Sequence, residues 1–222
     1  MEKIEPREPV PPASQLAVLP FLAAMQGFLT ASDVDDLRLT IHRVMSREEQ
    51  EFLQQVSPYL PLTKTAKPTD GRIFSVDTGI MGAAYEHKKL FRTRYFPSDQ
   101  ALQDALREDV ILKDATKAKS WIALPFLGPS GQVVLILFAD CDTLNFFADD
   151  LRVTQMAAMC EGFCRLQDYL QDSPFANLRN FPLQKGDPNR DGGKAYSVQE
   201  QVDIELPRFQ NLTSFNYEAA AA

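Results

Sequence analysis

The chain has few of the residues on which most catalytic and metal sites depend. Its 222 residues include three cysteines, two histidines and one tryptophan. Three cysteines in a chain of this length do not make a disulfide framework, which indicates a reducing compartment. Two histidines leave little for general acid–base chemistry, and the sequence has no recognisable serine–histidine–aspartate set, phosphate-binding loop or pair of catalytic carboxylates. We therefore predict no catalytic residues and a chain that is not an enzyme.

An excess of positive charge and a long apolar segment are also missing. The formal net charge is −7, so the chain does not supply the clustered cations that neutralise nucleic-acid phosphates. No stretch approaches the ~18 apolar residues that a membrane-spanning helix needs. The first residues carry acids and prolines in place of the apolar core of a signal peptide. We predict a cytoplasmic protein that binds neither nucleic acid nor a membrane.

Apolar residues are plentiful, at 45% of the chain, and they concentrate in the stretch Lys119–Asp140. Two apolar runs, Trp121–Leu127 and Val133–Phe138, flank the sequence Gly-Pro-Ser-Gly, which is typical of a chain reversal. Because the second run is apolar at every position, both faces of that strand must be covered by other parts of the chain. The pattern predicts an antiparallel hairpin at the centre of a sheet.

Segments on either side of the hairpin are expected to supply these covers. Leu37–Val44 has both strand-like alternation and helical spacing, and we favour a strand because several of its residues are β-branched. The other predicted elements are a helix from Ser14 with Pro20 inside it, a strand over Phe52–Leu60 that Pro58 and Pro61 would confine to an edge, a short helix after Thr78, a strand over Leu90–Phe96, a helix from Ser98 to Arg107, and a long helix over Asp149–Leu170.

The chain divides into three predicted segments. Residues 1–12 contain four prolines and alternating charges, which predicts a disordered leader. Residues 13–172 hold the predicted elements and form the domain. Residues 173–222 form an extended C-terminal arm, which begins as a linker over 173–196 and then shows weak alternation over Tyr196–Ile204. Aromatic residues in the polar end of this arm favour docking on a surface over an unstructured tail.

Four motifs in this order resemble those of GAF domains. Gly79–Ala84 resembles the G-I-h-G-x-A turn, in which h is apolar, and Ser120–Phe126 resembles the S-h-h-x-V-P-L strand. Gly131–Leu137 resembles the G-x-V-h-G-h-L strand, and Phe146–Asp150 resembles the F-x-x-x-D approach to the last helix. The resemblance covers about residues 14–171. It implies an α+β fold with a twisted antiparallel sheet of five or six strands, the N- and C-terminal helices on one face, and loops and short helices enclosing a pocket on the other.

The better-known ligand classes of GAF domains do not match this sequence. The N-K-x-F motif of cyclic-nucleotide-binding members has no counterpart, because Phe146 follows Asn145. Cys141, Cys160 and Cys164 lie outside the pocket region where bilin-binding relatives carry a cysteine. They also lie outside the loops where relatives that reduce free methionine sulfoxide carry theirs. We predict that none of these three functions applies.

The candidate ligand-binding residues are Tyr85, Arg92, Arg94 and Trp121. Arg92 and Arg94 belong to the one dense basic run, and alternation along a strand places them on the same face. The resemblance implies that this strand borders the pocket, so the two guanidinium groups could hold a small anion such as a phosphate or carboxylate. The alternative is a solvated edge or an ion-pair surface. Tyr85 and Trp121 could line the pocket or belong to the core.

No metal or cofactor is predicted. Cys160 and Cys164 lie on one helical face and fit small core residues better than a metal or redox pair, since no histidine is near them in the sequence. Asp140 and Asp142, with two further aspartates that follow, could gather a cation. An acidic loop before a helix is, however, favourable through the helix dipole alone.

The expected function is that of a non-catalytic regulatory or sensory domain, which binds a small ligand or a protein signal and acts through a partner protein. The alternative is a structural or adaptor subunit whose pocket is closed and which assembles through its helices and its arm. For both we expect a homodimer or a larger protein assembly, with the apolar stripe Met156–Leu170 as one candidate surface. A cavity bordered by Arg92, Arg94 and Trp121 would favour the sensor.

Overall fold

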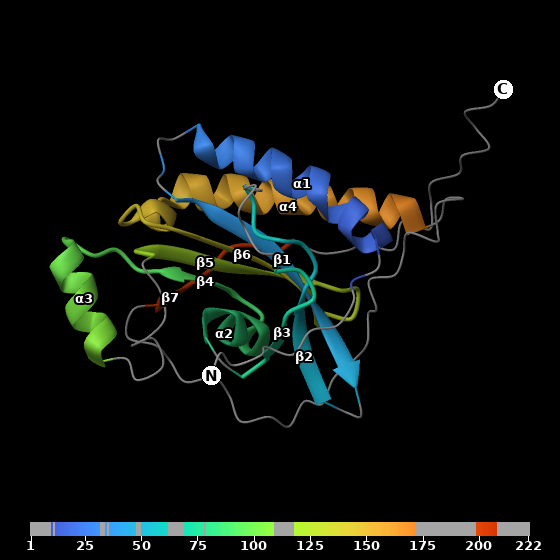
Figure 1. Ribbon diagram of the computed structural model, residues 1–222, viewed down its shortest axis with the longest axis horizontal. Helices are drawn as coiled ribbons and strands as arrows, with labels where there is room; N and C mark the ends of the chain where they lie inside the picture. The colour runs from blue at the N-terminus through green and yellow to red at the C-terminus, as the bar shows by residue number, and fades with distance from the viewer. Residues whose placement is uncertain are drawn as a thin grey trace.

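The computed structural model describes residues 10, 12–31, 34, 36–47, 50–61, 69–77, 79–108, 118–171 and 199–207. They build a seven-stranded antiparallel sheet with the strand order β3-β2-β1-β6-β5-β4-β7, and helices lie on both of its faces (Figure 1). The predicted α+β fold is confirmed. No helix of the described part of the chain is long and apolar enough to cross a membrane.

The bounds of most elements lie within a few residues of the predicted ones. The helices are α1 (Pro12–Thr30), α2 (Gly79–His87), α3 (Asp99–Glu108) and α4 (Asp150–Gln171), with a 3₁₀ turn, η1, over Phe146–Ala148. The strands are β1 (Arg38–Arg47), β2 (Gln50–Gln55), β3 (Ile73–Ser75), β4 (Leu90–Thr93), β5 (Ser120–Leu127), β6 (Val133–Cys141) and β7 (Gln199–Val202).

The hairpin of β5 and β6 is formed as predicted. Its register runs from Ser120 opposite Cys141 to Phe126 opposite Leu135, and every residue of β5 is buried. The chain reverses at Gly131, which has a φ of 76° and donates its N–H to the carbonyl of Gly128 at 2.9 Å. Residues with a Cβ are strained at such a φ, so glycine suits this position.

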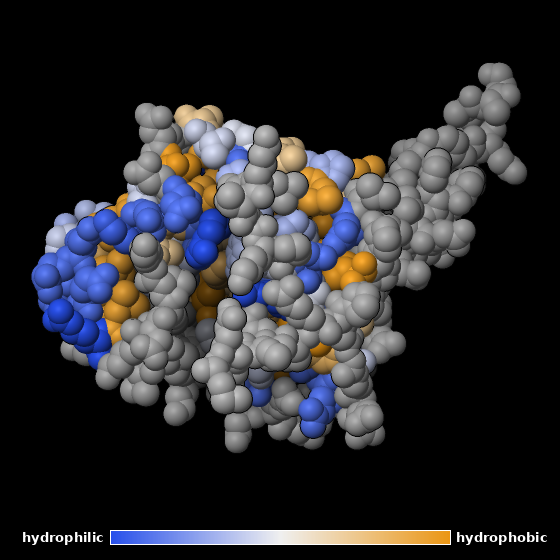
Figure 2. Space-filling model, viewed as in Figure 1, coloured by the Kyte–Doolittle hydropathy of each residue, from blue (hydrophilic) through white to orange (hydrophobic). Residues whose placement is uncertain are grey.

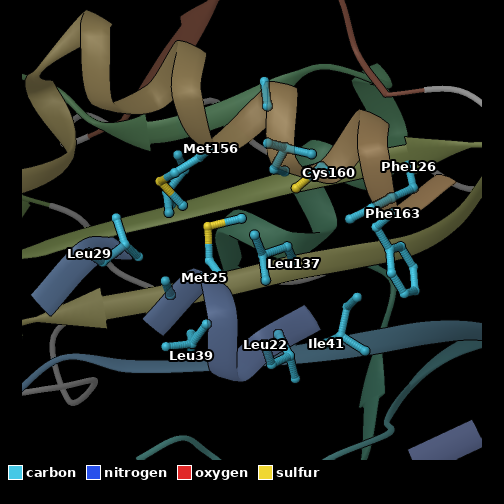
Figure 3. Packing of buried hydrophobic residues seen from close by; sticks show 14 of the residues in the cluster. Leu22, Met25, Leu29, Leu39, Ile41, Phe126, Leu137, Met156, Cys160 and Phe163 are labelled. Atoms are coloured by element: carbon cyan, nitrogen blue, oxygen red, sulfur yellow. The ribbon is translucent and has the colours of Figure 1, made fainter. Parts of the chain in front are cut away.

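Helices α1 and α4 lie together on one face of the sheet (Figure 1). In Figure 3, Leu22, Met25 and Leu29 of α1 project into the same cluster as Met156, Cys160 and Phe163 of α4, above β1 and β6. The rings of Phe21 and Phe163 stack with their centroids 4.5 Å apart. Apolar side chains spaced three and four apart on both helices therefore close this face of the sheet.

The opposite face is covered by α2 and α3 over a second apolar cluster. Helix α2 starts close to the preceding turn: a Cβ at Gly82 would lie 2.9 Å from the carbonyl oxygen of Val76, so only glycine fits there without a shift. The buried members of this second cluster include Val44, Leu53, Ile80, Phe91, Phe96, Leu102, Trp121, Ala123 and Ile136. Both faces of the central hairpin are thus covered.

Strand β2 corrects one expectation. We placed an edge strand over Phe52–Leu60, but β2 ends at Gln55 and lies between β1 and β3. The edge assignment is wrong because Pro58 and Pro61 come after the end of the strand, where no ladder hydrogen bond is lost. Leu60 instead forms an isolated bridge with Leu39.

Strand β7 raises the sheet from the expected five or six strands to seven. It comes from the C-terminal arm and pairs with β4, with Leu90 opposite Val202 and Thr93 opposite Gln199. Its inward-facing residues continue past the strand: Val202, Ile204 and Leu206 pack partly buried against the core. The predicted disordered leader, apart from Val10 and the start of α1, and the predicted linker over 173–196 lie outside the described residues.

Candidate functional site

Arg92 lies at a junction of three chain segments. Its Nε donates to the Glu200 carboxylate of β7 at 2.9 Å, and its Nη2 donates to Asp150 at the start of α4 at 2.6 Å. Its Nη1 donates to the carbonyl oxygen of Phe147 in η1 at 3.2 Å. We call these four residues the Arg92 junction. It links a strand, the N-terminus of a helix and the arm through one side chain.

Alternation along β4 explains how this arginine is placed. Leu90 and Arg92 share the face of the sheet that α1 and α4 cover, since Leu90 belongs to that cluster, whereas Phe91 faces α2. The Arg92 side chain is only 9% exposed. A cation so deeply buried is stable only with partners, and two carboxylates and a carbonyl supply them.

The four predicted ligand-binding residues do not come together. Trp121 is buried in the apolar cluster on the α2 side of the sheet, and the half-buried Tyr85 packs against that cluster. Arg92 points to the other face of the sheet. Arg94 follows the end of β4, is exposed, and places its guanidinium 4.9 Å from the ring centroid of Phe96. An anion at Arg92 would have to displace the partners in the Arg92 junction. The ligand-binding role of these residues stays a prediction.

The acidic residues at the end of β6 and before α4 have separate partners. Arg38 donates to both carboxylate oxygens of Asp140, at 2.9 and 2.6 Å. Burial raises the pKa of the Asp140 carboxyl, and the hydrogen bonds from Arg38 oppose that rise. Asp149 accepts from the N–H of Leu151 at 2.9 Å as an N-terminal cap of α4. Within the described residues, no group of three or more metal-ligating side chains is placed to hold a cation.

His42 and Gln55 form a second buried polar site, on adjacent strands. They are paired residues of β1 and β2, and both are fully buried. Neither ring nitrogen of His42 nor Oε1 of Gln55 has a hydrogen-bond partner among the described residues. Burial lowers the pKa of His42 to about 3, so the ring is neutral at pH 7. Its neighbours are the ring edges of Phe74 and Phe138, with centroids 5.3 and 6.4 Å away.

The three cysteines are buried, and none of them forms a disulfide. Burial raises the pKa of Cys141 to about 12 and raises that of Cys160 well above the ordinary thiol value. The thiolate is the reactive form of cysteine, so these environments disfavour a nucleophilic thiol at either position.

Sequence reasoning missed most of these partners. Glu200 sits in the weakly alternating stretch of the arm, and an acid at a strand position was the one available signal for a pairing with Arg92. Asp150 was noted as a charge at a helix start, not as a partner of Arg92. For His42 and Gln55 the only signal was polar residues inside predicted strands, and their register could not be read from the sequence.

Comparisons with known proteins reach only the level of the fold. No protein-family model matches the chain, and no curated protein matches it in sequence. Solved structures do match. A type II free methionine-R-sulfoxide reductase from Thermoplasma acidophilum has a TM-score of 0.46 at 12% identity, covering 66% of this chain and 88% of that one. A GAF domain structure has a TM-score of 0.41 at 13% identity, and the match covers 66% of this chain and 86% of that one. A GAF sensor protein from Burkholderia vietnamiensis has a TM-score of 0.39 at 17% identity, and the match covers 70% of this chain and 90% of that one.

These neighbours overturn one expectation. We predicted from the sequence that the chain is not an enzyme, and that prediction is contradicted because free methionine-R-sulfoxide reductases are among the similar structures. The scarcity of histidine and of accessible cysteine was too narrow a ground for excluding catalysis. Proteins of similar architecture include both sensors and enzymes, and no particular activity is transferred to this chain at such low identity.

Proposed function

We propose that the chain is a GAF-like assembly module, which works through contacts of its helical layer and its arm with another protein chain. The observation that carries the proposal is the apolar cluster on the α2 side of the sheet. Its large buried side chains include Trp121, Phe91 and Leu102. This favours the closed interior that we associated with a structural or adaptor subunit.

The helical layer supplies the second argument. Among the described residues, two of the three exposed large apolar side chains lie on α4: Leu151 is 67% exposed and Leu166 is 54% exposed. Figure 2 shows orange and pale surface over α1 and α4, in contrast to the blue surface over α3. Exposed apolar surface on a helical layer is typical of a protein–protein contact. The predicted stripe itself was misplaced in part, because Met156 and Phe163 are buried inside the domain.

Charge substitution of the exposed leucines tests this function. We expect Leu166→Glu and Leu151→Glu to lower the mass measured by sedimentation equilibrium from that of an assembly to that of one chain. The matched control is Tyr95→Glu, because Tyr95 is 68% exposed but lies outside the helical layer. If the unsubstituted chain sediments as a single chain at all concentrations, and no partner chain co-purifies with it, the proposal fails.

A ligand-responsive regulatory domain is the second candidate, and the His42 and Gln55 pair favours it. Buried polar atoms without partners are rare in native proteins, and here this cross-strand residue pair carries three of them: two imidazole nitrogens and one amide oxygen. A small uncharged molecule that offers both a donor and an acceptor would satisfy them. Mass spectrometry of the protein purified from its own cells, first native and then denaturing, would reveal such a molecule. No released molecule would leave this candidate without support.

A further inference from the structure

Strand β7 forms the edge of the sheet next to β4 (Figure 1). A backbone ladder joins the two strands, with Leu90 opposite Val202 at one end. The arm then follows the same edge past β4, since the N–H of Leu127 at the end of β5 donates to the carbonyl of Pro207 at 3.1 Å. We call the edge of β4 together with this end of β5 the β4 slot. Because the slot holds its occupant through backbone hydrogen bonds, it can accept other extended segments with suitable side chains.

Two cations give the β4 slot a preference for acidic segments. Arg92 binds Glu200 at 2.9 Å, and the ammonium group of Lys89 lies 3.9 Å from the carboxylate of Asp203. Between these two acids, Val202 packs partly buried against the apolar cluster under α1 and α4. The slot therefore selects a strand in which an acid stands two residues before an aliphatic residue and a second acid follows directly after it.

The contacts of β7 are those of a segment that the domain can release. The side chain of Val202 is only half-buried. If β7 leaves, Arg92 keeps its bonds to Asp150 and to the carbonyl of Phe147, so the buried cation still has partners. Segments with few buried side chains open at a low cost in free energy. The side chains that alternate with those facing the core are exposed: Gln201, Asp203 and Glu205.

Gln201 is the residue with which β7 fits the slot least well. It lies opposite Phe91 and is exposed, on the α2 side of the sheet. The ring of Phe91 has the ring of His87 beside it, with the centroids 5.6 Å apart. Pairs of aromatic residues across two strands stabilise a sheet, and a glutamine cannot form one. A strand with an aromatic residue at this position should therefore bind more tightly than β7 does.

A different protein is a better source of such a strand than a second copy of this chain. Each copy brings one β7 and one β4 slot, so an exchange between copies leaves the contacts unchanged, whereas association costs translational and rotational freedom. A strand from a different protein can supply the aromatic contact that Gln201 does not make. Only such a strand improves on the contacts that β7 already has.

We propose that the β4 slot is a docking site for an extended strand of a different protein, and that β7 occupies the slot until this strand displaces it. The strand carries the pattern acid, aromatic, aliphatic, acid, aliphatic at the positions that Glu200 to Ile204 hold in β7. Addition of a strand to a sheet edge is a common mode of peptide recognition. The inference rests on the proposed function and specifies which part of the partner protein makes the contact.

Synthetic peptides test the preference of the slot. Three labelled peptides are compared by fluorescence anisotropy with the full-length protein: one with the sequence of residues 199–207, a second with Gln201→Tyr, and a third with Glu200→Lys. We expect the second to bind about five times more tightly than the first, which is the effect of one favourable cross-strand pair, and the third not to bind. Equal binding of all three would overturn the proposal.

A full-length variant with a weakened β7 tests the displacement. Glu200→Lys places a cation against Arg92 and should raise the affinity for the second peptide by at least about tenfold. The matched control is Glu205→Lys, which makes the same change of charge at an exposed residue beyond β7 and should bind the peptide like the unsubstituted chain. If Glu200→Lys gains no affinity, or no longer unfolds cooperatively, β7 is not a displaceable strand and the proposal fails.

A disulfide shows where the peptide binds. The residue opposite Lys89 in the antiparallel register is Asp203. The full-length Lys89→Cys variant should cross-link with the second peptide when that peptide also carries Asp203→Cys. The Leu166→Cys variant, with its cysteine on the exposed side of α4, should not. Equal cross-linking of the two variants would overturn the assignment of the site. The natural cysteines are buried, and oxidation of the unsubstituted chain controls for them.

Sedimentation separates this inference from the proposed function. If the Glu200→Lys variant binds unsubstituted copies as tightly as it binds the peptide, the occupant is a second copy and the assignment to a different protein is wrong. If Leu151→Glu and Leu166→Glu dissolve an assembly while no peptide binds to any variant, the proposed function stands and the docking site is wrong.

Discussion

Arg92 of β4 and Glu200 of β7 form an ion pair at 2.9 Å between residues 108 positions apart in the chain. The pair matters because the arginine side chain is 9% exposed and the glutamate side chain is 39% exposed. It fixes the arm to the sheet at the same guanidinium that holds the start of α4. The first prediction concerns this relationship.

Replacing the two residues should have unequal effects. Glu200→Gln removes one partly exposed charge partner and should lower the free energy of unfolding by about 1 kcal/mol or less. Arg92→Gln also removes the bond to the exposed Asp150 and leaves the buried carbonyl of Phe147 without its donor, so the loss should be about 2 kcal/mol. Urea unfolding of both single variants and the double variant measures the coupling. Additive losses would mean that the two side chains do not interact in solution.

Acid should destabilise the protein through His42. The folded-state pKa of about 3 lies below the ordinary value of 6.5, so the unfolded chain binds a proton between these pH values and the folded chain does not. The contribution of His42 to stability is therefore complete above pH 6.5 and is lost as the pH falls toward 3, by about 3 kcal/mol at pH 4.5. His42→Phe should flatten this part of the profile in urea unfolding at several pH values.

The control for His42 is the other histidine of the chain. His87 has a side chain that is 44% exposed, and the His87→Gln variant should lose stability in acid as the unsubstituted protein does. A profile that flattens in His87→Gln and not in His42→Phe would contradict the burial of His42.

Two helical glycines give a matched pair. Gly27 of α1 and Gly162 of α4 both have open space where a Cβ would be, so alanine at either should stabilise the helix by about 1 kcal/mol. Only Gly162→Ala should also weaken association, because Gly162 lies on the exposed side of α4 together with Leu151 and Leu166. Thermal unfolding measures the first effect, and the concentration dependence of the sedimentation mass measures the second. An unchanged dimer in Gly162→Ala would speak against close contact there.

Ending the chain after Gln171 should leave a folded domain. The sheet would keep six strands and both apolar clusters, but it would lose the contacts of Glu200 and of the partly buried Val202, Ile204 and Leu206. We expect native-like circular dichroism, a lower free energy of unfolding by about 2 kcal/mol, and faster hydrogen exchange at the β4 amides. A truncated chain without cooperative unfolding would show that the arm is an integral part of the domain.

The sequence predicted what depends on local pattern and failed where distant segments meet. The β5–β6 hairpin was predictable because its apolar runs and its Gly-Pro-Ser-Gly reversal are contiguous. The prediction that Arg92 and Arg94 share a face assumed a strand that includes both residues. However, β4 ends at Thr93, and alternation cannot be extended past the end of a strand. The place of β2 was misjudged for a similar reason, since the prolines that suggested an edge lie outside the strand.

The candidate site was harder to predict than the fold. A strand that adds to a sheet from the end of the chain has its partner set by non-local register, and weak alternation over Tyr196–Ile204 did not indicate β4. Arg92 was singled out as a candidate ligand-binding residue, whereas the partners it has in the structure come from three separate segments. Whether a buried charge binds a ligand or forms internal ion pairs depends on the groups that tertiary packing places next to it.

The most direct test of the account is native mass spectrometry of the full-length protein purified from its own cells. One chain has a mass of 25.0 kDa, and we predict a species of twice that mass which separates into single chains on denaturation without releasing a small molecule. A species with the mass of one chain that carries a small molecule, released on denaturation, would contradict the assembly module and favour the ligand-responsive domain.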